Sequence, residues 1–415
     1  MFRKVTKRVL SPFERKYGDT LIQLSVEVTK PSEIPSMIER LIKYAVPLHV
    51  SLDGDQLQYK EKVNVLQMPK DVSNIGDSCN WILKNMQPSK VASATLGYND
   101  RFILVSSQHL CCDGGYFKYM INLIQDNLEG EKVPWNFLQI PGDEYLREHL
   151  KKMDQAIIYN RRSDTTVLKS RESDFEREND QLVRVSTLTF DAKKTHCYLN
   201  GRLNNLTDSL WSTFLLSIAA YNRELPNKFG IASCIDLRDR FPEKNREILS
   251  GITNFISILS HSCETNKDDT ILSIGQKLRK SLNDRIKNGD LPAYYLYNQD
   301  STKAEGSTSE ISNMGPIFIK DPIKDVFMQI SYKDPIQSAV LSLLTWSVVS
   351  IERNELAFRL RYQPSWLHDY EADAVVNGIK FALEELPSNT PVGDAFKEIQ
   401  AFQDGYVRAR QSNSK

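Results

Sequence analysis

The chain has 415 residues, which is enough for two domains of about 200 residues each. Its 53 basic residues balance its 53 acidic residues, so bulk charge gives no attraction to nucleic acid. With 40% hydrophobic and 26% charged residues, the composition is that of a globular protein and excludes a disordered or fibrous one.

No apolar run approaches the roughly 20 residues of a transmembrane span, and no apolar stretch follows the basic N-terminus as it does in a signal peptide. The six cysteines are scattered and show no zinc-like spacing, so we expect no metal site. Reduced thiols and a cytoplasmic location fit this pattern, and the sequon at Asn205 is then accidental.

In the first half, alternating apolar residues predict a strand over Leu21–Val28, and helical spacing predicts a helix over Ile34–Lys43. An apolar helical face predicts a second helix over Tyr116–Leu128. Turn residues between apolar runs predict two hairpins, Val46–Leu52 with Leu57–Leu66 about Asp53-Gly54, and Val91–Leu96 with Arg101–Ser107 about Asn99-Asp100.

The stretch from about Leu146 to Arg184 is charged and lacks periodic apolar residues, which predicts a solvated crossover linker. Ser301–Glu310 is small and polar, and is expected to be a mobile loop. The predicted strands of the second half are Val185–Phe190, Phe229–Ile235, and the hairpin of Thr345–Ile351 with Leu356–Tyr362 over Asn354-Glu355. The predicted helices are Leu210–Tyr221, which is expected to be amphipathic, Thr270–Lys287, and Glu371–Leu386, which closes the fold.

The most informative segment runs from Phe102 to Gly115 and reads Phe-Ile-Leu-Val-Ser-Ser-Gln-His-Leu-Cys-Cys-Asp-Gly-Gly. A buried strand is predicted to end at His109, where packing can fix the imidazole, and a helix is predicted to follow a tight loop. A general base must be neutral near pH 7, as histidine largely is. Asp113 is expected to hold the loop by an ion pair or backbone bonds. Gly114 and its neighbour permit a positive φ and close backbone approach.

Each of these residues also has a purely structural interpretation. A histidine that ends a strand is more often a satisfied structural residue, and Asp113 can simply cap the helix. Cys111 and Cys112 are better explained as small buried hydrophobic residues than as nucleophiles. A cysteine-based thioesterase needs a second histidine, and none stands out. His49 lies in a predicted strand, and the other histidines are expected at the surface or in loops, namely His149, His196, His261 and His368.

His109-Leu-Cys-Cys-Asp113-Gly114 matches the HxxxDG signature, and here the sequence resembles the superfamily related to chloramphenicol acetyltransferase. That superfamily includes alcohol acetyltransferases, plant BAHD acyltransferases, polyketide-associated acyltransferases and condensation domains of peptide synthetases. The motif lies about a quarter of the way along the chain, as in the two-lobed members. Dihydrolipoyl acyltransferases carry the same pattern near their C-terminus, so we set them aside.

Two further segments resemble this superfamily. Ile235–Pro242 resembles the DxRxR stretch of the second lobe, and Gly251 and Asn254 follow it as in the family. Ile311–Gly315 resembles the SNLG element of the alcohol acetyltransferase and polyketide-associated branches. The DFGWG element of the plant BAHD branch is missing from the sequence, which favours the alcohol acetyltransferase side.

The resemblance implies an α/β (α+β) fold of two lobes, each a mixed sheet flanked by helices, with an active-site tunnel between them. The expected boundaries are 1–160 for the first lobe, 161–184 for the linker and 185–415 for the second lobe. The resemblance also implies that Arg238 pairs with Asp113 from the other lobe, and that Gly114 supports the motif. Ser312 or Asn313 is a candidate donor to the oxyanion, although this pair alone is only a loop signature.

The resemblance further implies direct transfer of an acyl group from coenzyme A to a small acceptor, with His109 as general base and no permanently bound cofactor. We expect an alcohol acceptor and a monomer. Lys277, Arg279 and Lys280 can meet the coenzyme phosphates, although a solvated helix face explains them as well. Two alternatives stay open, an amide-forming enzyme of condensation type and a non-catalytic member that binds a lipid or serves as a scaffold.

Overall fold

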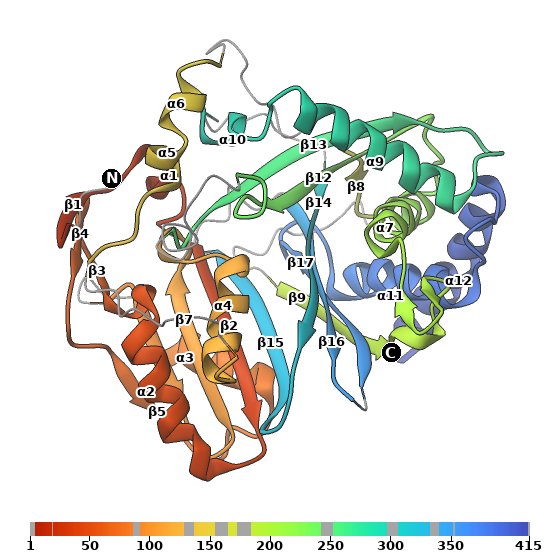
Figure 1. Cartoon of the computed structure of the whole chain (residues 1–415). Helices are drawn as coiled ribbons and strands as arrows, with labels where there is room; N and C mark the ends of the chain where they lie inside the picture. Colours follow the sequence, from red (N-terminus) through yellow and green to blue (C-terminus); the bar gives the residue numbers. More distant parts are fainter. Residues whose placement is uncertain are drawn as a thin grey trace. The chain divides into compact units, whose positions relative to one another are not determined.

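The computed structural model describes residues 5–18, 20–85, 92–127, 137–153, 165–171, 184–241, 252–296, 306–332, 340–351 and 353–413. Residue contacts divide the chain into two compact units. Unit 1 comprises Met1–Lys152, Asp236–Ile256 and Ile317–Lys333. Unit 2 comprises Met153–Ile235, Ser257–Pro316 and Asp334–Lys415. Each unit mixes strands and helices, as expected for an α/β protein (Figure 1).

The main sheet of unit 1 has the strand order β15-β2-β7-β6-β5. β2 is antiparallel to both of its neighbours, and all nine of its residues are buried. β15 comes from late in the chain, yet it lies along β2 over the whole length of that strand (Figure 1). The five strands are Ile323–Tyr332, Thr20–Val28, Phe102–Gln108, Ala94–Tyr98 and Val65–Gln67, in sheet order.

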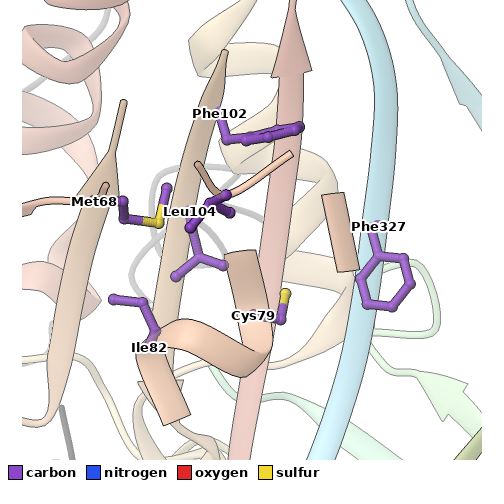
Figure 2. Packing of buried hydrophobic residues seen from close by; sticks show 7 residues of the cluster. Met68, Cys79, Ile82, Phe102, Leu104 and Phe327 are labelled. Atoms are coloured by element: carbon purple, nitrogen blue, oxygen red, sulfur yellow. The ribbon is translucent and has the colours of Figure 1, made fainter. Parts of the chain in front are cut away.

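Helix α3 covers one face of this sheet. Phe102 and Leu104 are two residues apart on β7 and so share one face of the strand. They belong to one apolar cluster with Ile82 of α3 and Phe327 of β15 (Figure 2). The helices of unit 1 are α1 Pro12–Arg15, α2 Ile34–Tyr44, α3 Ile75–Asn85, α4 Gly114–Ile124, α5 Gly142–Tyr145 and α6 Arg147–Leu150. A smaller sheet of this unit has the order β1-β4-β3, with bounds Lys7–Val9, Gln56–Tyr59 and Val50–Asp53.

Unit 2 is built on a sheet with the order β13-β12-β14-β16-β17-β9, in which β8 also pairs with β14. β12 and β14 are parallel, whereas β16, β17 and β9 form an antiparallel ribbon. The strands are β8 Val167–Leu168, β9 Arg184–Asp191, β12 Lys228–Asp236, β13 Ile256–Glu264, β14 Ser307–Phe318, β16 Val340–Val349 and β17 Asn354–Tyr362. A separate two-stranded hairpin joins β10 Tyr198–Leu199 to β11 Arg202–Leu203.

The helices of unit 2 are α7 Leu206–Asn222, α9 Ile271–Lys287, α10 Ala293–Leu296, α11 Asp369–Glu385 and α12 Val392–Asn413. α7 packs against α9, α11 and α12. The expectation of an amphipathic helix here was wrong, because every residue from Asp208 to Tyr221 is buried. Its hydroxyl groups bond to carbonyl oxygens instead of water, as Ser212 does to Asp208 and Ser217 to Val375.

Several predicted elements differ from the structure. The stretch Val46–His49 is a 3₁₀ helix that contains Pro47, so the expected first strand of the hairpin begins only at Val50. The expected loop Ser301–Glu310 includes Ser307–Glu310, which belongs to β14 and is buried, while 301–305 lies outside the described residues. Among the longer elements, α3, α12, β13, β14 and β15 were not predicted.

The expected lobes 1–160 and 185–415 were continuous in sequence, whereas unit 1 takes in two later segments. The reason is hydrogen bonding: β15 pairs with β2, and Arg238 and Asn254 bond to the loop after β7. Most of the expected linker 161–184, at 161–164 and 172–183, lies outside the described residues.

Candidate active site

His109 follows directly on β7 and begins a 3₁₀ turn, His109–Cys111. Its side chain is buried, with the residue 6% exposed. The ring atom Nδ1 lies 2.8 Å from the carbonyl oxygen of Cys112. Because a carbonyl can only accept, Nδ1 carries the proton, and the neutral ring keeps its lone pair on Nε2. The loop thus selects the tautomer whose Nε2 can act as a base.

Asp113 is fully buried and caps α4. One carboxylate oxygen accepts the backbone N–H of Tyr116 at 2.8 Å. The other accepts the backbone N–H of Phe255 at 2.6 Å and Arg238 Nη2 at 3.0 Å. The cap and the ion pair, two alternatives from the sequence, therefore exist together. These contacts hold the loop, so we treat Asp113 as a positioning residue.

Arg238 forms the expected ion pair with Asp113, at 3.0 Å, and its side chain is 15% exposed. The same guanidinium contacts Asp236 at 3.0 Å and the carbonyl of Ile252 at 2.8 Å. Burial opposes its charged form, but Asp113 and Asp236 outweigh burial and raise the pKa of Arg238. Burial also raises the pKa of Asp236, against the pull of Arg238. Although Arg238 was expected to reach across from the other lobe, it belongs to unit 1 together with the motif.

The two glycines of the motif serve close packing. Gly114 is the first residue of α4. At Gly115, a Cβ atom would lie 2.6 Å from Arg238 Nη1 and would overlap the Asp236 carboxylate. Neither glycine is among the residues of positive φ, so the loop does not use the left-handed conformation that glycine permits. The absent side chain lets Arg238 approach the start of the helix.

Residues 252–255 contact the motif loop although they lie far from it in the sequence. The side-chain amide of Asn254 donates to the carbonyl of His109 at 2.6 Å, and the carbonyl of Thr253 accepts the N–H of Asp113 at 3.0 Å. The resemblance included Asn254 but gave it no role, and Gly251 lies outside the described residues.

Tyr17, which follows α1, packs its ring against the imidazole of His109, with centroids 4.6 Å apart. No sequence pattern pointed to this contact, because Tyr17 stands in a short loop without periodicity. Its neighbour Lys16 is partly buried, and burial lowers the pKa of Lys16 to about 8 although Asp143 opposes the shift. Tyr17 therefore places an aromatic ring against the histidine, and the residue before it is a lysine of lowered pKa.

The cysteines of the motif are poor nucleophiles. Cys111 and Cys112 are both fully buried, and burial raises the pKa of each thiol. This supports their interpretation as small hydrophobic residues. Among the described residues, no group of three or more His, Cys, Asp or Glu side chains is arranged to hold a metal ion. Nor does any helix in that part of the chain have the length and apolar character needed to cross a bilayer.

Ser312 and Asn313 lie in β14 and belong to unit 2, whereas His109 belongs to unit 1. Asn313 donates to the hydroxyl of Thr207 at 3.0 Å and accepts the N–H of Gly315 at 2.9 Å. These bonds shape the strand next to Gly315, whose φ is 68°. A role for Ser312 or Asn313 at the oxyanion stays a prediction.

The three basic residues of α9 that were considered for the coenzyme phosphates each have an acidic neighbour. Lys277 pairs with Asp269 at 2.8 Å, and Lys280 pairs with Asp284 at 2.6 Å. Arg279 pairs with Asp208 at 2.5 Å and lies over the ring of Trp211. These pairs favour the interpretation of a solvated helix face over that of a phosphate site.

No protein-family model matches the chain, and no curated protein matches its sequence. Its structure, however, is similar to solved structures over nearly its whole length. Polyketide synthase associated protein 5 from Mycobacterium tuberculosis is 13% identical, with a TM-score of 0.62. The alignment covers 94% of this chain and 99% of that one.

The starter condensation domain of rhizomide synthetase, in complex with C8-CoA, is 10% identical, with a TM-score of 0.62. The alignment covers 92% of this chain and 94% of that one. The X-domain from teicoplanin biosynthesis is 9% identical, with a TM-score of 0.58. The alignment covers 95% of this chain and 98% of that one. The chain therefore has the two-lobed, mixed α/β fold of these structures.

Proposed function

We propose that this protein is an acyltransferase that moves an acyl group from a coenzyme A thioester to the hydroxyl group of a small acceptor. The observation that carries the proposal is the geometry of His109. Its Nδ1–H is committed to Cys112, 2.8 Å away, so Nε2 holds the lone pair that a general base needs. The ring is buried and stands at the end of a strand, which limits its motion.

In the proposed reaction, the acceptor oxygen attacks the thioester carbonyl while Nε2 of His109 takes the hydroxyl proton. A C–O bond forms, and the carbonyl electrons move to the oxygen of a tetrahedral intermediate. When these electrons return, the C–S bond breaks, and the imidazolium gives its proton to the departing thiolate. The products are an ester and free coenzyme A, and His109 is again neutral. The other contacts of the loop keep the ring in place during both proton transfers.

The likeness to solved structures supports the proposal at the level of the fold. One of those proteins, the rhizomide starter condensation domain, is described in complex with C8-CoA. The thioester is a co-substrate here, and no resident cofactor is part of the scheme. The tunnel between the lobes, the monomeric state and the choice of an acetyl donor remain predictions.

The first test is free-thiol release from acetyl-coenzyme A and octanoyl-coenzyme A with a panel of alcohols and amines. We expect acceptor-dependent release by the wild-type protein. His109→Ala should lower kcat/KM by about a hundredfold to ten-thousandfold, because general-base help is lost. His149→Gln is the matched control, since His149 is an exposed histidine of the same unit.

His149→Gln should leave the rate unchanged. Equal rates for His109→Ala and the wild type would exclude His109 as the base. Silence of the folded wild-type protein with every donor and acceptor would instead favour a binding role. The responding acceptors separate ester formation from amide formation.

A second candidate function is amide formation, in which an amine replaces the hydroxyl. The specific observation in its favour is that condensation domains are among the proteins of the same fold. The same base and the same proton transfers serve either acceptor. A non-catalytic role as a binding protein is the remaining candidate, and a related fold, the X-domain of teicoplanin biosynthesis, is described in complex with OxyB.

A further inference from the structure

Residues 252–255 hold the motif loop at both of its ends. At the first residue of the loop, Asn254 Nδ2 donates to the carbonyl of His109 at 2.6 Å. At the last residue, Asp113 donates its N–H to Thr253 at 3.0 Å and accepts the N–H of Phe255 at 2.6 Å. We call residues 252–255 the clasp. Thr253 and Phe255 contact Asp113 through their backbone groups. Asn254 contacts His109 itself, and it does so through its side chain.

Asn254 is an unusual choice for simple packing. The residue is 5% exposed, and its Oδ1 is buried without a hydrogen-bond partner among the described residues. An unpaired buried acceptor costs about 1–3 kcal/mol, which leucine, of similar shape, would avoid. The His109 carbonyl also accepts from Cys112 N at 3.4 Å, so it would keep one partner without Asn254. The feature that leucine cannot supply is the amide N–H that Asn254 gives to His109.

The tautomer of His109 depends on the same loop. Its Nδ1–H reaches the carbonyl of Cys112, three residues further on, and this bond requires the turn to stay closed. Asn254 fixes the carbonyl of His109, from which the turn starts. We propose that Asn254 is a positioning residue, which keeps the turn closed and thereby holds the lone pair of His109 on Nε2. This inference rests on the proposed function in that Nε2 is the base.

The decisive variant is Asn254→Leu, which removes the donor and the unpaired acceptor together. We expect kcat to fall by about tenfold to a hundredfold with KM unchanged, as for the loss of a supporting hydrogen bond. We also expect the midpoint of urea unfolding to stay at or above that of the wild type, because a buried acceptor without a partner is removed.

A spectroscopic readout tests the tautomer without any activity. Protein labelled with ¹⁵N-histidine gives imidazole nitrogen signals, and those of His109 are identified by their loss in His109→Gln. The wild type should show one tautomer, with the proton on Nδ1 at neutral pH. Asn254→Leu should show both tautomers. This measurement keeps its meaning if the proposed acyl transfer is not found.

Asn99→Leu is the matched control. Asn99 has the same 5% exposure in the same unit, and its amide also donates to a backbone carbonyl, that of Pro69, at 3.0 Å. It lies in the turn before β7, at the other end of that strand from His109. We expect Asn99→Leu to lower the unfolding midpoint and to leave both kcat and the His109 signals unchanged.

If Asn254→Leu does not fold, Asn254→Ser and Asn254→Ala replace it. Serine can donate through its hydroxyl and alanine cannot, so serine should retain the higher kcat and the larger fraction of the Nδ1–H tautomer. The proposal is overturned if the His109 signals are the same in the wild type and in Asn254→Leu. It is equally overturned if serine and alanine variants match in both readouts, since a merely structural asparagine would behave in that way.

Discussion

At the scale of single residues, the site is stabilised by a buried cluster of charges. Asp113 has no exposed surface, and its two oxygens accept from two backbone N–H groups and from Arg238. A buried carboxylate is tolerated only when it is paired and hydrogen-bonded, as it is here. Arg238 shares its charge between Asp113 and Asp236, so the loop depends strongly on this one cation.

Arg238→Met should therefore be costly. It leaves the Asp113 charge buried without its cation, and we expect the free energy of unfolding to fall by about 3–5 kcal/mol. Urea unfolding measures this loss. Combining Arg238→Met with Asp113→Asn should cost less than the sum of the two single changes, because the residues are in contact.

Arg15→Met is a suitable control, since Arg15 pairs with Asp55 at 3.3 Å and both side chains are about half exposed or more. An exposed pair contributes about 0–1 kcal/mol, so this variant should unfold almost as the wild type does. A similar loss for both variants would contradict the importance of the buried cluster.

At the scale of elements, the first turn of α4 packs so closely against Asp236 and Arg238 that it leaves no room for a side chain at Gly115. Gly115→Ala would put a methyl group 2.6 Å from Arg238 Nη1 and into the Asp236 carboxylate. We expect a loss of about 1–3 kcal/mol in unfolding free energy, as for an overpacked core, measured by thermal or urea unfolding.

Gly76→Ala provides the comparison, because Gly76 is also the second residue of an 11-residue helix in unit 1, α3. There a methyl group meets Phe327 at an ordinary 3.7 Å. Alanine should stabilise this helix by about 0.5–1 kcal/mol. If both alanine variants were stabilising, the crowding inferred at Gly115 would be wrong.

The elements that the sequence predicts well are those with a clear alternation, a continuous apolar run or an apolar helical stripe. The alternating pattern of Leu21–Val28 corresponds to β2, at Thr20–Val28, and the apolar run after Asn99-Asp100 corresponds to β7, at Phe102–Gln108. The helix that was predicted from its apolar stripe corresponds to α4. Ser307–Glu310 was expected to be a loop because it is polar throughout. Its strand exists because distant groups satisfy that polarity, as Ser342 does for Glu310 at 3.0 Å.

The same limit applies to the site. The motif predicts His109 and Asp113, because they are recognisable residue types at a fixed spacing, and the ion pair with Arg238 was implied by the family resemblance. It gave no role to Asn254, which meets His109 across 145 positions of sequence, and it missed Tyr17. Such contacts depend on how distant segments pack, which local propensity does not encode.

At the scale of the whole molecule, neither unit is continuous in sequence. Unit 1 takes Arg238 and Asn254 from Asp236–Ile256, and its edge strand β15 from Ile317–Lys333. The motif histidine therefore gains its contact with Asn254 only after the chain has passed through unit 2 once, and the sheet of unit 1 gains β15 only after a second passage. Unit 2 in turn depends on its own buried polar groups, which respond to pH.

His261 on β13 is one such group, although the sequence suggested a surface position. It is 2% exposed, and its Nε2 lies 2.9 Å from the hydroxyl of Ser233, which itself accepts the indole N–H of Trp211 at 3.0 Å. The indole can only donate, so the Ser233 proton is directed to His261 Nε2. Burial, with a smaller contribution from nearby Arg279, lowers the pKa of His261 from 6.5 to about 3.

This shift predicts a pH-dependent stability. Above pH 6.5 both states hold a neutral His261, and its contribution is fully present. As pH falls from 6.5 towards 3, the unfolded chain binds a proton that the folded chain refuses, so the free energy of unfolding decreases. The slope for one group is about 1.4 kcal/mol per pH unit, which gives about 2 kcal/mol between pH 7.5 and pH 5.

His261→Gln separates this effect from all other titrations. Glutamine can accept from Ser233 but does not titrate, so the variant should lose about 2 kcal/mol less than the wild type between pH 7.5 and pH 5. His196, whose pKa is lowered by burial too, is present in both proteins and cancels in the difference. Urea unfolding at several pH values measures the two slopes. Parallel curves would show that His261 binds its proton equally well in the folded and unfolded states, which would contradict its burial as a neutral group beside Ser233.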